Sequence, residues 1–314
     1  MDTNRWIEAV MGQAVVGAPA LVQELWSGFG RLERIALESE TVVLKSVEPG
    51  AALHPRGWSG GRSHERKLTS YAVERAFYSD FAGRLGSAAR VPRFLAARDT
   101  ESGGQLLLED LDSAGFSARR SKVSDAEADA CLRWLAAFHG AFLGVEPRGL
   151  WPRGTYWHLA TRPDELAAMI DLRLQGAAKE IDERLEGAAH RTLVHGDAKL
   201  ANFCCGSVSS EMVAAVDFQY VGGGVGVQDV AYFLGSCYGD DDLERRAEDA
   251  LEIYFGALRE ALAVDSDALE AEWRALWPYA WADFQRFLDG WAPGHWKLSR
   301  YSSERVAEIL NGRL

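Results

Sequence analysis

The residue types best suited to chemistry occur in two short motifs, HGDAKLAN at residues 195–202 and DFQ at residues 217–219. They supply two carboxylates and one amide, from Asp197, Asp217 and Asn202. A magnesium-dependent phosphoryl transferase needs such groups as its base and its two metal ligands. Either motif alone is a weak signal, but their order and their spacing of about fifteen residues together predict three groups that converge on one triphosphate.

Asp197, Lys199 and Asn202 are predicted to lie on a loop between two short strands, where polar groups can converge without disturbing a core. Asp197 is the predicted base, which orients or deprotonates an attacking hydroxyl. Asn202 and Asp217 offer the hard oxygen ligands that Mg²⁺ prefers. Lys199 could stabilise charge on the transferring phosphoryl group, or it could be a solvated loop lysine.

Two further residues are predicted to support this loop. His195 has the side chain of a general base, but it precedes the loop, so we expect it to pack or hydrogen-bond to hold the loop in place. Asp229 opens a predicted helix. It could cap the N-terminus of that helix, or it could brace the catalytic loop.

A lysine inside an apolar strand predicts a buried ion pair. Lys45 lies in the strand Thr41 to Val47, where an unpaired ammonium would be costly to desolvate. Glu74 shares the inward face of the helix Ser70 to Leu85 with apolar residues at helical spacing. The pair would hold Lys45 against the α and β phosphates of ATP. The alternative is a lysine on an edge strand that reaches water and a glutamate at the margin of the apolar stripe.

Two segments are candidates for other parts of a nucleotide. The connection between the first two predicted strands contains Ser27, Gly28 and Gly30, and its glycines would let backbone N–H groups approach a phosphate. A hairpin turn would also need glycine for its conformation alone. The segment Leu106 to Leu111 passes out of an apolar strand, and its backbone edge could pair with adenine.

The order of predicted elements indicates an α+β chain with two lobes. Strands are predicted at residues 20–25, 31–38, 41–47, 93–98 and 105–109, with helices at 4–15 and 65–85 and a loop at 49–63. Later helices are predicted at 125–143, 162–185, 227–238, 243–263 and 266–288, with short strands at 191–194, 203–205 and 212–216. We therefore expect a bilobal fold: a five-stranded antiparallel N-terminal lobe with one main helix (residues 1–109), a helical C-terminal lobe (110–314), and a ligand between them.

Composition limits the possible partners. The 314 residues include 34 Lys and Arg against 46 Asp and Glu, a net charge of −12, which disfavours nucleic acid and anionic membranes and favours a neutral or cationic substrate. Four cysteines without metal-ligand spacing fit a reducing compartment. No signal-peptide pattern or long apolar window is present. We expect a soluble cytoplasmic protein that acts on a small molecule, with no nucleic-acid, membrane or obligate protein partner.

The motifs HGDAKLAN, VDFQ and QDVAYFLG, preceded by VVLK, ERAFY and LLLEDL, resemble the aminoglycoside phosphotransferase and choline kinase family, most closely its ecdysteroid kinase-like branch. The resemblance implies a protein-kinase-like fold that uses ATP and Mg²⁺. It implies the site residues in these roles: Asp197 as the catalytic residue, Asn202 and Asp217 as magnesium ligands, Lys45 with Glu74 at the ATP phosphates, Glu109, Asp110 and Leu111 at adenine, and Asp229 as a brace for the catalytic loop.

Departures from protein kinases in the same motifs favour a small-molecule acceptor. Gly196 stands where protein kinases place an arginine, Gln219 ends the DFG-type motif, and no Ala-Pro-Glu element follows. We therefore expect transfer of the γ-phosphoryl group of ATP to a hydroxyl of an aminoglycoside, a choline-like compound, a sugar or a steroid-like alcohol. The alternative is a catalytically idle kinase-like protein that binds a nucleotide or another ligand.

The C-terminal helices carry many aromatic residues that could receive the acceptor. They could form a cation–π cage for a quaternary amine or a stacking floor for a ring, or they could be core. Asp283 and Asp289 could add attraction for amines. The aromatic residues are Trp273, Trp277, Tyr279, Trp281, Phe284, Phe287, Trp291 and Trp296.

Overall fold

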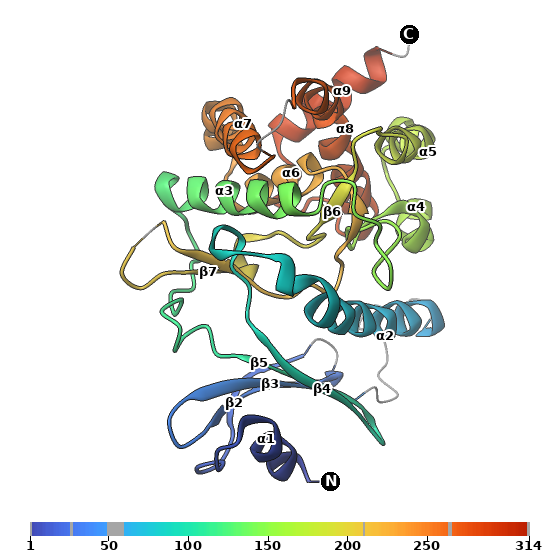
Figure 1. Ribbon diagram of the computed structural model, residues 1–314. Helices are drawn as coiled ribbons and strands as arrows, with labels where there is room; N and C mark the ends of the chain where they lie inside the picture. The colour runs from blue at the N-terminus through green and yellow to red at the C-terminus, as the bar shows by residue number, and fades with distance from the viewer. Residues whose placement is uncertain (1, 26–27, 49–59, 210, 263–265, 313–314) are drawn as a thin grey trace.

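The chain folds into a sheet-based N-terminal part and a larger, mainly helical part (Figure 1). The computed structural model describes residues 2–25, 28–48, 60–209, 211–262 and 266–312. In Figure 1, α2 lies between the sheet and the helical part, and the two termini lie at opposite ends of the molecule. The predicted α+β, bilobal architecture is confirmed.

The element bounds are as follows. The strands of the main sheet are β1 (Ala20–Glu24), β2 (Gly30–Ala36), β3 (Thr41–Val47), β4 (Phe94–Thr100) and β5 (Gly103–Glu109). The α-helices are α1 (Thr3–Met11), α2 (Gly60–Ala76), α3 (Asp125–Ala141), α4 (Pro163–Ala167), α5 (Leu172–Glu186), α6 (Val227–Cys237), α7 (Asp240–Leu262), α8 (Asp267–Trp291) and α9 (Arg300–Asn311). The short strands are β6 (Thr192–Val194), β7 (Phe203–Cys205), β8 (Val213–Ala215) and β9 (Gly222–Gly224). The remaining helical turns are the π-helical η2 (Phe77–Phe81) and the 3₁₀ turns η3 (Ala82–Arg84), η4 (Ser87–Ala89), η5 (Leu159–Thr161) and η6 (Leu200–Asn202).

The main sheet is antiparallel throughout, in the order β1-β2-β3-β5-β4. The strand β3 is therefore flanked on both sides, and its side chains alternate between the two faces of the sheet. Helix α1 covers one face, where an apolar cluster forms. The cluster consists of Trp6, Ile7, Ile35, Leu37, Val42, Leu44 and Leu107.

Helix α2 lies against the other face and continues into the π-helical turn η2. The inward face that the sequence predicts for this segment is buried, since Glu74, Phe77, Tyr78 and Phe81 are each less than 7% exposed. The ring of Phe77 stacks on that of Phe218 at 3.9 Å between centroids. Because Phe218 follows Asp217 directly, this contact couples α2 to the DFQ motif.

Two predicted helices have different limits in the structure. The first ends at Met11, because Gly12 adopts a left-handed conformation with φ 67°. The helix predicted at 162–185 is two helices, α4 and α5, because Asp171 accepts hydrogen bonds from the backbone N–H groups of Arg173 and Leu174 and starts a new helix there. A break of this kind leaves the helical periodicity nearly unchanged, so periodicity alone did not reveal it.

Strand β9, helix α9 and the start of α2 were not predicted from the sequence. Strand β9 is Gly222–Gly224, which has no side-chain pattern, yet it pairs antiparallel with β6. Helix α9 begins after Ser299, whose hydroxyl accepts from the backbone N–H of Ser302. Helix α2 begins at Gly60, within the loop predicted at 49–63, and residues 49–59 lie outside the described residues.

No helix in the described part of the chain combines the length and apolar character needed to cross a membrane.

Candidate active site

Lys45 lies at the centre of the main sheet and forms the ion pair that the sequence predicts. Its Cα partners are Leu32 on β2 and Leu106 on β5, so the edge-strand alternative is wrong. The side chain is buried, and Nζ lies 2.6 Å from Oε2 of Glu74 on α2. Asp217 Oδ1 lies 3.7 Å from the same Nζ. One cation thus joins β3, α2 and the DFQ motif.

The charges around Lys45 set its protonation. Burial disfavours the ammonium, but the carboxylates of Glu74 and Asp217 outweigh that effect and raise the pKa of Lys45. Burial likewise disfavours the Asp217 carboxylate, yet the nearby lysines, Lys45 first, lower the pKa of Asp217. Both groups are therefore charged at neutral pH.

Asp217 has the geometry of a ligand-binding residue. Its backbone is left-handed, with φ 69°, although it is not glycine, a conformation that is uncommon for such residues and concentrates at functional sites. Its Oδ1 is buried and has no hydrogen-bond partner among the described residues, while 35% of the side chain stays exposed. A buried carboxylate oxygen without a donor is costly, and a bound cation would satisfy it.

The catalytic-loop residues that the sequence predicts are in direct contact. Lys199 Nζ lies 2.8 Å from Asp197 Oδ2, and Asn202 Nδ2 donates to the backbone carbonyl of Asp197 at 2.8 Å and to its Oδ2 at 3.1 Å. The amide nitrogen of Asn202 therefore faces Asp197, which leaves its Oδ1 for a metal. Tyr232 Oη donates to Asp197 Oδ1 at 3.1 Å. Both oxygens of Asp197 are thus oriented by the protein.

Asp229 hydrogen-bonds to the backbone at the start of this loop. Its carboxylate accepts from the backbone N–H of His195 at 2.5 Å and of Gly196 at 3.0 Å, and it lies 3.1 Å from His139 Nε2. It lies in the first turn of α6, whose N-cap is Gly226, so it is not the cap of that helix. These contacts agree with the brace rather than the cap.

His195 connects the two motifs through hydrogen bonds of its two ring nitrogens. Its Nδ1 accepts from the backbone N–H of Asp197 at 3.2 Å, and its Nε2 donates to the carbonyl of Val216 at 3.0 Å. The ring is fully buried against Phe218, 4.5 Å between centroids. His195 therefore fixes the positions of Asp197 and Asp217 relative to each other.

Gly196 has a steric reason to be glycine. Its φ is +78°, and a Cβ there would lie 2.1 Å from the carbonyl oxygen of Tyr220 and 2.6 Å from the backbone nitrogen of Thr155. No side chain fits between these two backbone segments. The absence of an arginine at this position, noted in the sequence, is thus built into the packing.

The predicted phosphate-covering turn is described only in part. Gly28 has φ +70° and donates its N–H to the Leu25 carbonyl, and a Cβ on Gly30 would lie 2.0 Å from the carbonyl oxygen of Ser46. Both glycines therefore serve the hairpin conformation, whatever else they bind. Ser27 lies outside the described residues.

The predicted adenine segment uses its side chains within the protein. Glu109 forms a bidentate pair with Arg90 at 2.5 and 2.6 Å. Asp110 accepts from Arg34 at 2.6 Å and from Thr41 Oγ1 at 2.6 Å, and Leu111 is buried in a small apolar cluster. Any contact of residues 109–111 with adenine would have to come from the backbone.

The sequence analysis did not predict that a second lysine, Lys67 on α2, would lie at the site. Lys67 Nζ donates to Gln219 Oε1 at 2.8 Å, and it has no carboxylate partner among the described residues. Burial, with the Lys45 charge adding to it, lowers the pKa of Lys67 to about 8, although Asp217 opposes this shift. Lys67 precedes Glu74 by two helical turns, so the shared helix face could have revealed it.

The metal-ligand set is small. No group of three or more His, Cys, Asp or Glu side chains within the described ranges could hold a metal ion. Asn202 and Asp217 alone would bind an ion weakly, but Mg²⁺ commonly uses one or two protein ligands and completes its shell with phosphate and water. The unpartnered oxygen of Asp217 and the free Oδ1 of Asn202 fit an ion bound in this way.

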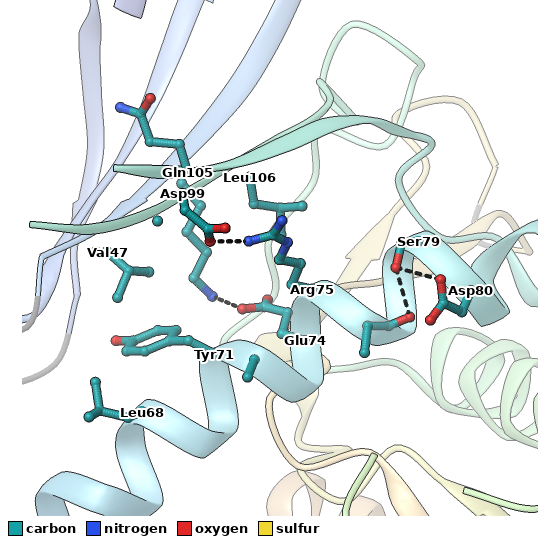
Figure 2. Close-up of a pocket in the computed structure, with 15 residues that line it drawn as sticks. Val47, Leu68, Tyr71, Glu74, Arg75, Ser79, Asp80, Asp99, Gln105 and Leu106 are labelled. Carbon is teal, nitrogen blue, oxygen red and sulfur yellow. Dashed lines mark hydrogen bonds and ion pairs between the residues drawn. The ribbon is translucent and has the colours of Figure 1, made fainter. Parts of the chain in front are cut away.

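A cavity of about 460 Å³ lies on the other side of the ion pair, between α2 and strands β3, β4 and β5 (Figure 2). Lys45 and Glu74 reach its wall, and Val47, Leu68 and Tyr71 line it from the apolar side. Leu106, the first residue of the predicted adenine segment, also lines it, but the predicted catalytic and metal-binding residues Asp197, Asn202 and Asp217 do not.

The aromatic residues of α8 are mostly core. Trp273, Trp281 and Phe287 are almost fully buried and pack in apolar clusters, as do Trp277 and Phe284. Tyr279 and Trp291 of α8 are more exposed, as is Trp296, which follows the end of that helix.

The two acidic residues that could attract an amine are used elsewhere. Asp283 is 2% exposed and pairs with Arg286 at 2.6 Å and with Trp157 Nε1 at 2.9 Å. Asp289 accepts from the backbone N–H groups of Ile170 and Asp171. Neither carboxylate is available for a ligand, because each already holds structural hydrogen bonds.

A five-stranded antiparallel sheet joined to a helical part that holds Asp197, Asn202 and Asp217 defines a protein-kinase-like fold. The family model described as the phosphotransferase enzyme family matches residues 37–264, and the chain belongs to that family. No curated protein sequence matches the chain.

Solved structures of several small-molecule kinases share the fold. A microcompartment-associated aminopropanol kinase is 16% identical, with 99% of this chain and 95% of that chain covered and a TM-score of 0.52. A thermostable aminoglycoside phosphotransferase APH(4)-Ia, in a ternary complex with ADP and hygromycin B, is 14% identical over 99% and 98%, with a TM-score of 0.51. The choline kinase LicA from Streptococcus pneumoniae is 13% identical over 98% and 96%, with a TM-score of 0.52. At these identities the likeness concerns the fold.

Proposed function

We propose that this protein is an ATP- and Mg²⁺-dependent kinase that transfers the γ-phosphoryl group to a hydroxyl of a small molecule. The observation that supports this most strongly is the linked set of charges: Lys45 pairs with Glu74 and approaches Asp217, while Asp197 contacts Lys199 and Asn202. Asp217 Oδ1 accepts no hydrogen bond from the described residues and lies 3.7 Å from Lys45 Nζ, which leaves it able to contact a bound cation. Solved relatives with ADP or an ATP analogue and a small-molecule acceptor support the same reaction class.

The residues divide the work of phosphoryl transfer. Lys45 and Lys67 would neutralise phosphate oxygens, and Asn202 and Asp217 would hold Mg²⁺, which shields the phosphate charge when bound. Asp197 would accept the proton of the attacking hydroxyl, while Tyr232 fixes the orientation of the carboxylate. The new bond forms between the hydroxyl oxygen and the γ-phosphorus, the bond from the γ-phosphorus to the bridging oxygen breaks, and ADP leaves with that oxygen.

Lys199 has a position that suits charge stabilisation. Burial disfavours its ammonium, but the Asp197 carboxylate at 2.8 Å outweighs that effect and raises the pKa of Lys199. It therefore stays charged beside the attacking group, where negative charge spreads over the phosphoryl oxygens in the transition state.

A thermal-shift titration with a non-hydrolysable ATP analogue tests nucleotide and metal binding. The melting temperature should rise with the analogue and rise further with Mg²⁺, and the metal-dependent part should vanish in Asp217→Ala. ADP release measured against a panel of amino alcohols, aminoglycosides, sugars and hydroxy acids then tests transfer. A protein that binds the nucleotide but phosphorylates no member of the panel would favour the idle binding protein, and no shift at all would contradict the proposal.

A further inference from the structure

A lysine from the connection between α8 and α9 reaches the aromatic residues beside the catalytic aspartate. Lys297 Nζ lies 4.6 Å from the ring centroid of Tyr232, 5.7 Å from that of Trp296 and 5.8 Å from that of Phe284. These distances are within the range of cation–π contacts. The rings that could have formed a cage for a quaternary amine therefore already hold an ammonium of the protein itself.

Tyr232 connects this lysine to the reaction. Its hydroxyl donates to Asp197 Oδ1 at 3.1 Å, while its ring carries Lys297 on one face. The charge of Asp197 also acts on Lys297 electrostatically, and that of Lys199 opposes it. Lys297 thus lies one side chain away from the group that would receive the hydroxyl proton.

Lys297 has no anionic partner, although it is largely removed from solvent. Among the described residues no carboxylate lies within ion-pair distance of its Nζ, and burial lowers its pKa to about 8. A partly desolvated ammonium without a partner is unfavourable, and an anion placed beside it would form a charge-assisted hydrogen bond.

Two buried acidic side chains of the helical part are paired with arginines. Asp283 pairs with Arg286, and Glu165 pairs with Arg162 at 3.0 Å. Asp197, which contacts Tyr232, is itself paired with Lys199. Lys297 therefore carries a positive charge that no carboxylate of the described residues pairs at ion-pair distance, although the whole chain carries a net charge of −12.

We propose that Lys297 is a specificity-determining residue that binds an anionic group of the acceptor, so that the substrate is an alcohol carrying a carboxylate or a phosphate rather than an amine. This inference rests on the proposed kinase function and narrows its substrate class. It reverses the preference for a cationic substrate that net charge alone suggests. The same ammonium repels a quaternary amine from the rings that it occupies.

Calorimetric titration tests the anion site without turnover. The protein, saturated with Mg²⁺ and a non-hydrolysable ATP analogue so that the γ-phosphate position is filled, is titrated with inorganic phosphate, acetate and tetramethylammonium. We expect at least one of the two anions to bind and tetramethylammonium not to bind. The anion that binds more tightly shows whether the anionic group of the acceptor is a phosphate or a carboxylate.

Variants assign the binding to Lys297. The Lys297→Met substitution should weaken anion binding by about tenfold or more, the usual effect of losing a hydrogen bond to a charged group. The Lys297→Arg substitution should retain most of the affinity. Lys179→Met is the matched control, because Lys179 is an exposed lysine on α5 with 84% of its side chain in solvent, and it should change nothing. Tetramethylammonium binding to the wild type, no anion binding, or equal anion affinity in Lys297→Met would each overturn the proposal.

Turnover with matched alcohols separates this inference from the kinase proposal. Glycerate and glycerol phosphate should release ADP faster than glycerol and choline, and Lys297→Met should remove that preference. If choline is the best substrate, the inference is wrong and the kinase proposal stands. If no nucleotide binds, the kinase proposal fails, and the same titration on the nucleotide-free protein still decides whether Lys297 binds an anion.

Discussion

Asp217 and Asp283 are both acidic residues withdrawn into the protein, and their surroundings differ in an informative way. Asp283 is paired with Arg286 through Oδ1 and accepts from Trp157 through Oδ2, so each of its carboxylate oxygens has a donor. Asp217 keeps one buried oxygen without a donor and lies 3.7 Å from Lys45. The first is a structural ion pair, and the second is prepared for a ligand that the chain does not supply.

The same contrast is found on both the phosphate-binding side and the acceptor-binding side of the proposed site. On the phosphate side, Asp217 and Lys67 carry charges that are not paired by carboxylate or ammonium at hydrogen-bond distance. On the acceptor side, Asp283 and Glu165 are paired with arginines, whereas Lys297 contacts aromatic rings and has no carboxylate partner among the described residues. The unpaired charge, rather than burial or residue type, distinguishes residues that await a ligand from residues that hold the fold. Each prediction below tests that distinction.

The largest effect should follow from Asp197→Asn. An amide cannot accept the hydroxyl proton, so kcat should fall by about 10² to 10⁴-fold, the usual contribution of a general base. Binding of the ATP analogue and the melting temperature should stay close to wild type, since Lys199, Asn202 and Tyr232 can still hydrogen-bond to the side chain. Unchanged kcat would remove Asp197 from the reaction.

Replacement of the two compared aspartates should affect different properties. Asp283→Ala leaves Arg286, which is 1% exposed, without its partner, and loss of one member of a buried pair costs about 3–5 kcal/mol. Asp217→Ala should cost much less stability, because its Oδ1 lacks a donor, but it should abolish the Mg²⁺-dependent part of nucleotide binding. Urea unfolding and thermal shift with and without Mg²⁺ measure the two quantities. Equal losses of stability would contradict the contrast.

The Lys45–Glu74 pair is expected both to stabilise the fold and to bind the ATP phosphates. Lys45→Met leaves Glu74 buried without a cation and should lower the free energy of unfolding by about 3–5 kcal/mol. The double variant Lys45→Met with Glu74→Leu should recover most of that stability, because two apolar side chains replace the pair. It should not recover ATP turnover. Recovery of turnover together with stability would show that the pair is structural only.

The smallest effect should be a change of acceptor affinity with pH. Burial lowers the pKa of Lys297 to about 8, with Asp197 and Cys237 opposing the shift and Lys199 adding to it. The ammonium is therefore present below about pH 8 and lost above it, so KM for an anionic acceptor should rise as pH passes through 8. The Lys297→Arg substitution should abolish this rise of KM above pH 8, since arginine stays charged. The pKa of Lys67 is also about 8, but its titration should change KM for ATP instead. If KM for the anionic acceptor still rises above pH 8 in the Lys297→Arg variant, Lys297 is not the residue that binds the anion.

Much of the fold could be predicted because its signals are local. The apolar alternation around Lys45 and the helical face that carries Glu74 and Phe77 predict β3, α2 and their contact, since a buried charge requires a partner wherever it lies. Strand β9 could not be found, because three glycines have no pattern and only the pairing with β6 makes them a strand. The break between α4 and α5 depends on Asp171 and on Asp289, far along the chain.

The sequence by itself determined which chemical groups the site contains. Asp197, Asn202 and Asp217 carry their chemistry in their own side chains, and their short spacing along two motifs limits how far apart they can lie. Only the tertiary structure decided which charges remain unpaired. The hydrogen bond from Trp157 to Asp283, the contact of Lys67 with Gln219 and the position of Lys297 over Tyr232 join segments distant in sequence. Electrostatic compensation depends on distance in space, and distance along the chain does not reveal it.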